Sequence, residues 1–482
     1  ESIMKSEDFG GIKERLFNYK GVSVKKRTVR SYPRPIAAHV LGHVSKVGPR
    51  DLNRDQFYIP QDYRGSSGLE LFYEKELRGA KGWHHYLKNR HGKYISKYLN
   101  GALDTTPRPG NNLKSTLDAD LQEYGEILMT GKIGAIVAIE PSTGEILAMI
   151  NAPTYDPNLL VGGEYGANYQ RLAKDKKKIL FHRSIQSRQP ASSIVKTMQS
   201  LIALNIGVAN EYTSFGCNKK LVGCHDHRNP LTLPEAIQHS CNPYYYNLVK
   251  KIFFKGRNGN MAQLRKGMDD WEKYVRSFGL GNPLGVDLYG EKDGNVPDVK
   301  EYDQIYGKNR WNYRTIYSLS IGQGEFSLTP IQMANLGVIL ANKGYYYTPH
   351  LIRQIGDEKL FFSDSNFYHK TLIDSSNFEI VHNGMQWVLE RPGGTAGRSK
   401  LEGVTICGKT GTSQNPHGDD HSVFMAFAPR NNPQIALAVF VENAGGGGGT
   451  AAPIASLMIE KYLKRKVERL KLEQVIVEKV FY

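Results

Sequence analysis

The sequence predicts an α+β fold in which one mainly antiparallel sheet is flanked by helices. Segments rich in β-branched and apolar residues occur near both ends of the main part of the chain, at residues 133–150, 403–412, 422–429 and 434–442. The stretch between them, residues 193–345, has apolar residues at helical spacing. We therefore expect the two terminal groups of strands to meet in one sheet.

Residues 1–112 are expected to form a separate, extended pedestal domain. This segment is polar and contains several glycines. It ends near Pro107-Arg108-Pro109-Gly110, which is typical of a linker. We therefore divide the chain into a pedestal at 1–112, a main domain at 113–470 and a short C-terminal tail at 471–482.

Turn and cap residues indicate the elements of the main domain in chain order. Residues 113–117 are typical of a strand, and Asp118 or Asp120 is expected to start a helix at 121–129. Pro141-Ser142-Thr143-Gly144 predicts the turn of the hairpin at 133–150. Residues 445–449 predict a flexible loop near the cleft end of the sheet, and a helix is expected near 453–466.

Composition limits the classes of function. The 482 residues suffice for two or three domains with a substantial core, and no run reaches the roughly 18 apolar residues of a membrane span. The net charge of +16 favours anionic lipid head groups or an acidic polymer as partners, although most of these charges are explained equally well as solvated surface. No nucleic-acid partner is expected, because no recognisable nucleic-acid module contains the basic clusters Lys25-Lys26-Arg27, 174–178 and Lys464-Arg465-Lys466.

The first candidate catalytic motif is Ser193-Ile194-Val195-Lys196. Residues three apart share one face of a helix, so Ser193 and Lys196 are expected to lie together in the first turn of a helix. A serine hydroxyl becomes a nucleophile when a neighbouring base removes its proton, and a lysine can be that base if its pKa is lowered. Taken alone, the motif is better explained by a serine that caps a helix and a lysine one turn later.

Two further motifs complete a candidate active site. Ser240-Cys241-Asn242 is expected to direct its outer side chains into one cleft from an extended loop, with Ser240 relaying a proton. Lys409-Thr410-Gly411-Thr412 ends a predicted strand, in which Gly411 would let a substrate backbone approach closely. The N–H of Thr412 would then join that of Ser193 in an oxyanion hole.

The three motifs together resemble the penicillin-binding proteins and class A β-lactamases. The resemblance extends over most of the chain and is strongest to class B penicillin-binding proteins of the elongation type. One departure is Ala191-Ser192, where many relatives have Pro-Gly. The matching segments are 38–42, 65–70, 134–149, 152–158, 321–324, 329–334, 391–396 and 425–429.

The resemblance implies a peptidoglycan D,D-transpeptidase with a serine β-lactamase-like catalytic domain on the periplasmic side of the bacterial inner membrane. Stem peptides ending in D-Ala-D-Ala would acylate Ser193, with Lys409, Thr410 and Thr412 binding the terminal carboxylate, and β-lactams would acylate the same serine. No cofactor is required for this chemistry. The pedestal would bind a membrane glycosyltransferase and other elongation-complex proteins. An N-terminal membrane anchor is expected upstream of Glu1.

Four cysteines add a second candidate site. Cys217, Cys224 and Cys241 occur near His225 and His227, and three thiolates with one imidazole form a structural zinc set. The resemblance implies Cys217, Cys224, His227 and Cys241 as ligands, with zinc holding the loop of the second motif. A Cys217–Cys224 disulfide or free thiols remain alternatives. Cys407 is expected to be a small buried hydrophobic residue.

Two other functions use the same motifs. A β-lactam-hydrolysing enzyme or a β-lactam sensor would carry them, but the long N-terminal segment and residues 321–350 favour a transpeptidase. A non-catalytic scaffold of the wall-synthesis complex would suit the pedestal, although it would not need an intact set of catalytic motifs.

Overall fold

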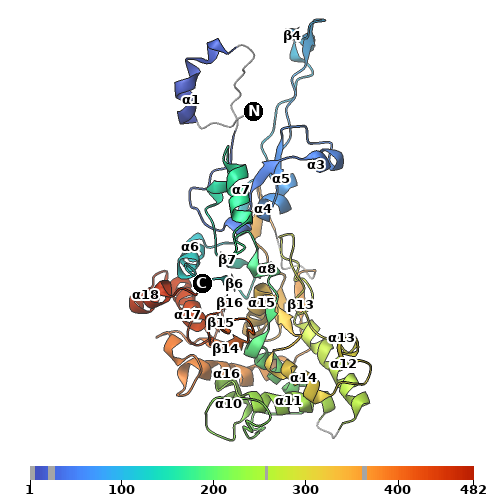
Figure 1. Ribbon diagram of the computed structural model, residues 1–482, viewed down its shortest axis with the longest axis vertical. Coiled ribbons are helices and arrows are strands. Elements are labelled where there is room, and N and C mark those ends of the chain that lie inside the picture. Colours follow the sequence, from blue (N-terminus) through green and yellow to red (C-terminus); the bar gives the residue numbers. More distant parts are fainter. Residues whose placement is uncertain (1–5, 20–27, 256–258, 361–365, 482) are drawn as a thin grey trace.

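The computed structural model describes residues 6–19, 28–255, 259–360 and 366–481 of an elongated molecule (Figure 1). The basic cluster Lys25-Lys26-Arg27 lies outside the described residues. None of the helices within these ranges is long and apolar enough to cross a membrane.

A five-stranded sheet forms the centre of the main domain, and every neighbouring pair of its strands is antiparallel. The C-terminal strand β16 pairs with β6 from the start of the domain, which confirms that both ends of the domain share one sheet. Strand β14 lies at an edge. In spatial order the strands are β14 (Cys407–Ser413), β15 (His421–Ala428), β16 (Ile435–Val441), β6 (Gly134–Ile139) and β7 (Ile146–Ala152).

Helices cover both faces of this sheet. Helix α15 (Pro330–Ala341) packs on β15, β16 and β6, whereas α17 (Ala451–Lys464) lies on the opposite side of the sheet (Figure 1). Because both faces are covered, β16 is a continuous apolar run whose residues are all buried. Helix α16 (Phe378–Glu390) contacts β14, and α6 (Ala119–Leu128) contacts β7. As expected, Asp118 caps α6 by accepting hydrogen bonds from the N–H groups of Asp120 and Leu121.

The helical part of the main domain lies at the end far from the pedestal (Figure 1). Capping residues start several of these helices; Thr232 and Glu235, for example, form a capping box at α10. The helices are α9 (Lys196–Asn205), α10 (Leu233–Gln238), α11 (Asn242–Phe254), α12 (Met261–Ser277), α13 (Val299–Tyr306) and α14 (Tyr313–Ile316).

The pedestal consists of short elements joined by loops. Its contacts with the main domain include a hydrogen bond of 2.8 Å from the Tyr73 hydroxyl to Asp287. Its elements are α1 (Ser6–Lys13), α2 (Ala38–Leu41), β1 (Val44–Lys46), α3 (Pro49–Arg54), β2 (Tyr63–Gly65), α4 (Gly68–Phe72), α5 (Glu74–Leu77), β3 (Tyr86–Lys88) and β4 (Tyr94–Lys97).

Smaller elements complete the chain. Strand β8 lies directly before Ser193 in the chain, and its pairing with β9 helps to position that residue. These elements are β5 (Leu113–Ser115), α7 (Tyr165–Ala173), α8 (Arg183–Gln186), β8 (Gln189–Pro190), β9 (Ser327–Leu328), β10 (Tyr345–Tyr347), β11 (Ile352–Ile355), β12 (Glu358–Lys359), β13 (Tyr368–Lys370) and α18 (Leu470–Glu478).

Candidate active site

Ser193 lies in a 3-10 turn, Ser192–Val195, that leads directly into α9. The sequence predicted the first turn of a helix, and the tighter turn places Ser193 just before Lys196 starts the α-helix. A distant segment fixes this turn. The N–H of Ser192 donates to the carbonyl of Gly322 at 2.6 Å, and that of Ala191 donates to Phe326 at 3.1 Å.

A cavity of about 350 Å³ opens at Ser193. Ser240, Asn242, Thr410 and Thr412 also line it, so side chains from all three motifs meet there. Among the described residues, the Ser193 hydroxyl has no hydrogen-bond partner, and it is therefore open to a ligand in the cavity. The arrangement suits attack by a hydroxyl on a bound carbonyl group.

Lys196 lies fully buried beside this cavity. Its ammonium group donates to Asn242 Oδ1 at 2.6 Å, to the Ser240 carbonyl at 2.8 Å and to Ser240 Oγ at 3.2 Å. Burial lowers the pKa of Lys196 to about 7, although the nearby thiol groups of Cys241 and Cys224 favour its charged form. A lysine with this pKa can lose its proton near neutral pH, as a general base requires.

The second motif differs from the expected extended loop. Asn242 begins helix α11, and Pro243 occupies the first helical turn, where a missing N–H has no cost. Ser240 has a left-handed backbone with φ of 51°. This sharp reversal brings both side chains to Lys196, as the two hydrogen bonds show.

The third motif lies on the edge strand β14, where Thr410 and Thr412 line the cavity and Lys409 is fully buried beside it. The Lys409 ammonium is buried and donates to the carbonyl of Thr410 at 2.9 Å. Burial holds the pKa of Lys409 well below its usual range, and the charge of Lys196 lowers it further. The two threonines are therefore the residues of this motif that line the cavity, and the buried Lys409 ammonium lies near enough to Lys196 for the two charges to repel.

The backbone of Thr412 points outward from the sheet. Its carbonyl accepts a hydrogen bond of 2.9 Å from Gln323 Nε2, and the N–H of a residue in an antiparallel strand points to the same side as its carbonyl. The N–H of Thr412 is therefore directed toward the open edge of β14, where the cavity lies.

Gly411 also has a packing role within the protein. A Cβ atom at this position would lie 2.1 Å from Ser192 Oγ, so the turn that carries Ser193 packs directly on β14. Gly447 approaches from the loop after β16, where a Cβ atom would lie 2.5 Å from the Gly411 carbonyl. Two segments of the protein therefore approach Gly411 closely, and the approach of a substrate backbone stays a prediction.

Sequence reasoning missed several residues that line the cavity. Gln323 belongs to the segment 321–324, which was noted only as a family signature. Thr395 forms a hydrogen bond of 2.7 Å with Thr410, and only the fold brings these two residues together. The remaining lining residues are His225, Ile321, Gln414, Asp420, Gly446, Gly447 and Gly448.

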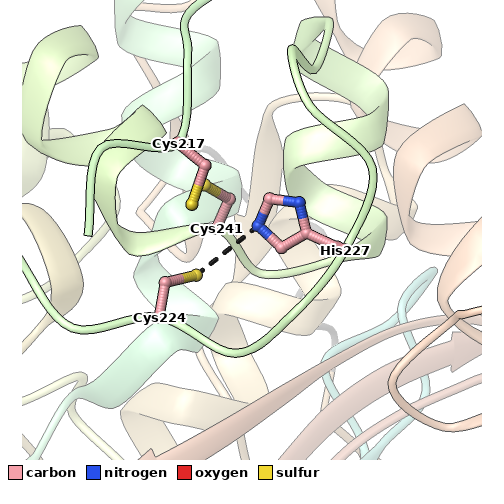
Figure 2. Close-up of side chains that lie close together, drawn as sticks. All are labelled: Cys217, Cys224, His227 and Cys241. Atoms are coloured by element: carbon pink, nitrogen blue, oxygen red, sulfur yellow. Dashed lines mark hydrogen bonds between the residues drawn. The ribbon is translucent and has the colours of Figure 1, made fainter.

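The four predicted metal ligands form one cluster beside the second motif. Figure 2 shows Cys217, Cys224, His227 and Cys241 pointing toward one another. One ligand atom from each lies within 4.8 Å of all the others, and Cys224 Sγ is 3.5 Å from His227 Nε2. A tetrahedral zinc site has ligand–ligand distances of about 3.8 Å, so a small contraction would complete it. All four cysteines of the chain are free, which argues against the disulfide alternative.

Known proteins resemble this chain over nearly its whole length. Residues 134–460 match the penicillin binding protein transpeptidase domain, and residues 1–115 match the penicillin-binding protein dimerisation domain. The peptidoglycan D,D-transpeptidase MrdA of Escherichia coli K12 is 30% identical over 89% of this chain and 71% of its own length.

Solved structures agree with these matches. PBP2 of Pseudomonas aeruginosa, in complex with WCK 5153, is 32% identical with a TM-score of 0.75 and covers 92% of this chain and 93% of its own. A chain from a peptidoglycan synthase complex that coordinates polymerization and crosslinking is 27% identical with a TM-score of 0.77. Its match covers 96% of this chain and 81% of its own.

Proposed function

Because this chain belongs to the penicillin-binding protein transpeptidase family, we propose that it cross-links peptidoglycan stem peptides through an acyl-enzyme on Ser193. The observation that carries this assignment is the buried ammonium of Lys196. It lies beside the cavity at Ser193 and is held by Ser240 and Asn242.

In the acylation step, neutral Lys196 takes the proton of Ser193, and Ser193 Oγ bonds to the carbonyl carbon of the penultimate D-alanine. The N–H groups of Ser193 and Thr412 donate to the oxyanion that develops. The amide bond to the terminal D-alanine then breaks, and Ser240 passes the proton from Lys196 to the departing amine. D-Alanine leaves, and the rest of the stem stays on Ser193.

The carboxylate of the substrate is bound by the hydroxyl groups of Thr410 and Thr412. A negative charge at this position stabilises the protonated form of Lys409, whose ammonium lies 2.9 Å from the carbonyl oxygen of Thr410 and supplies positive charge to the site. Asn242 orients the peptide amide. An amine from a neighbouring stem then attacks the acyl carbon, its proton passes to Ser193 Oγ through Lys196, and a new amide bond forms the cross-link.

A zinc ion held by Cys217, Cys224, His227 and Cys241 is the second part of this proposal. The ion would act as a structural tie with no part in the chemistry. Cys241 lies between Ser240 and Asn242, so fixing its sulfur fixes the two side chains that bind Lys196. The close approach of the four ligand atoms supports this assignment.

We further assign the chain to the periplasmic side of the bacterial inner membrane, in cell elongation. The pedestal at 1–112 would bind a membrane glycosyltransferase, and residues 113–470 would carry catalysis, with 471–482 as a tail. The likeness to a chain of a peptidoglycan synthase complex supports this partner.

The experiment incubates the protein with a stem pentapeptide ending in D-Ala-D-Ala and measures released D-alanine. Ser193→Ala is expected to reduce release at least about a thousandfold, because no other group forms the acyl-enzyme. Ser192→Ala is the matched control, since its hydroxyl is buried outside the cavity, and it should retain activity within about tenfold. Release by Ser193→Ala at the parent rate would refute the proposal.

A further inference from the structure

A two-stranded ribbon, residues 80–108, projects from the pedestal at the end of the molecule far from the catalytic sheet (Figure 1). Bridges between Ala80 and Arg108 and between Trp83 and Thr105 form its base, and β3 pairs with β4 toward its tip. All seven residues of the two strands are exposed on both faces. A two-stranded hairpin without a packing partner is only marginally stable in water.

The ribbon carries an unusual number of exposed apolar side chains. Tyr94 is 63% exposed and Ile95 is 65% exposed, although both are large. Exposed apolar patches of this kind mark interaction sites more often than chance. The exposed apolar residues are Trp83, Tyr86, Leu87, Tyr94, Ile95, Tyr98, Leu99 and Leu103.

The ribbon is also strongly basic. Residues 80–108 contain six lysines or arginines and one acidic residue, Asp104. Lys81 and Lys97 pair with Asp62 and Asp104 near the base. At the tip, among the described residues, the side chains of Lys88, Arg90 and Lys93 contact no carboxylate, so their charges are available to an external anion.

The tip presents these groups in a fixed arrangement. The side chain of Asn89 accepts hydrogen bonds from the N–H groups of His91 and Lys93, at 2.9 and 3.0 Å, which orders the turn. On one face of the ribbon, the rings of Tyr86 and Tyr94 meet edge to face, with 5.2 Å between their centroids. The Lys88 ammonium lies 4.7 Å from the centroid of the Tyr94 ring. Aromatic and cationic groups therefore share one surface.

We infer that the ribbon docks on an anionic lipid bilayer. An acidic polymer would satisfy Lys88, Arg90 and Lys93 but would leave aliphatic groups such as Ile95 in water. An apolar groove on a protein would cover Ile95 but would not explain why residues 81–97 contain five basic residues and no acidic one. A bilayer surface offers both phosphate groups and an apolar boundary, where tyrosine, tryptophan and lysine are favoured.

The test measures sedimentation of residues 1–482 with vesicles of phosphatidylglycerol and phosphatidylethanolamine, and with vesicles of phosphatidylcholine. The parent protein is expected to bind the anionic vesicles, with affinity that falls as salt rises. The variant Lys88→Ser, Arg90→Ser, Lys93→Ser should bind at least about tenfold more weakly, because each basic group contributes favourably near an anionic surface.

A matched control removes three positive charges from the catalytic domain, with Lys308→Ser, Arg398→Ser and Lys400→Ser, and should bind like the parent. A second reporter is Trp83, which is 50% exposed. Its emission should shift to shorter wavelength on anionic vesicles, a shift that Trp83→Phe removes while binding persists. This shift distinguishes a lipid boundary from an acidic polymer.

Equal loss of binding in the ribbon variant and the control would overturn the inference, because binding to the vesicles would then depend only on the net charge of the protein. Equal binding by the ribbon variant and the parent would also overturn it and would favour a protein partner for the ribbon. Acylation by penicillin should be unchanged in the ribbon variant, so failure here is separate from failure of the proposed chemistry.

Discussion

Ser192, directly before the proposed nucleophile, has a left-handed backbone with φ of 54°, a conformation that normally favours glycine. Its side chain is buried, and its hydroxyl has no hydrogen-bond partner among the described residues. Many relatives have glycine at this position, and the left-handed backbone angle explains why glycine is favoured there. The turn is held in this strained conformation by the hydrogen bond to Gly322.

Ser192→Gly should therefore stabilise the protein by about 1 kcal/mol, because it removes backbone strain and an unpartnered buried hydroxyl. The measurement is the free energy of unfolding in urea. Ser192→Ala is the control, since it removes the hydroxyl and keeps the Cβ atom. A glycine variant that is no more stable than the alanine variant would show that the turn is not strained.

His182 provides the second prediction at this scale. Both of its ring nitrogens are buried without a partner among the described residues, and its ring lies 5.7 Å from that of His39 in the pedestal. Burial, and then the like charge of His39, lower the pKa of His182 to about 3. In the unfolded chain His182 takes up a proton as pH falls below about 6.5, whereas in the folded protein it stays neutral until about pH 3. Buried neutral His182 therefore leaves the folded state at full stability above pH 6.5, and this stability is lost progressively as pH falls from 6.5 toward 3.

His182→Phe removes this titration. The free energy of unfolding of the variant minus that of the parent should therefore be about 1 kcal/mol larger at pH 5.5 than at pH 7.5. The experiment is urea unfolding of both proteins at the two pH values, which cancels the contributions of other groups. An unchanged difference between the proteins would mean that His182 is protonated in the folded state.

At the scale of elements, the sequence predicted strands and helices well where the periodicity was strong. The hairpin at 133–150 and the three C-terminal strands were found within a few residues. The expected extended loop at Ser240 was wrong, because Pro243 starts a helix there. Gln323 and Thr395 were missed as site residues, since their position depends on contacts between segments far apart in the chain.

The loop between α9 and α10, which carries three of the four cluster residues, gives the prediction at this scale. Protein purified without added zinc should contain one zinc per chain, and Cys217→Ser should weaken zinc binding by more than about 100-fold, because one of the four direct ligands is lost. The zinc content, measured by metal analysis, and the rate of acylation by fluorescent penicillin should decrease together in Cys217→Ser. Cys407→Ser is the control, because Cys407 is buried in β14, outside the cluster. Normal acylation in the metal-free protein would refute the positioning role of zinc.

At the scale of the whole molecule, the sheet explains how distant motifs form one site. β14 lies at one edge of the sheet, and β6 and β7 lie toward the opposite edge. The C-terminal strands of the domain therefore pair with its N-terminal strands. The turn at Ser192 packs on Gly411 of β14, and Lys196 then lies between this strand and the α11 start. The α+β fold followed from sequence, whereas these close approaches required the three-dimensional structure.

The most direct measurement is the mass of the intact protein after reaction with penicillin, followed by peptide mapping of the adduct. The account predicts one penicilloyl group per chain, attached to the peptide that contains Ser193. It also predicts that the hydroxyl of Ser193 carries the group, with Ser192 unmodified. A protein that forms no adduct, or one that carries it at another residue, would contradict the account.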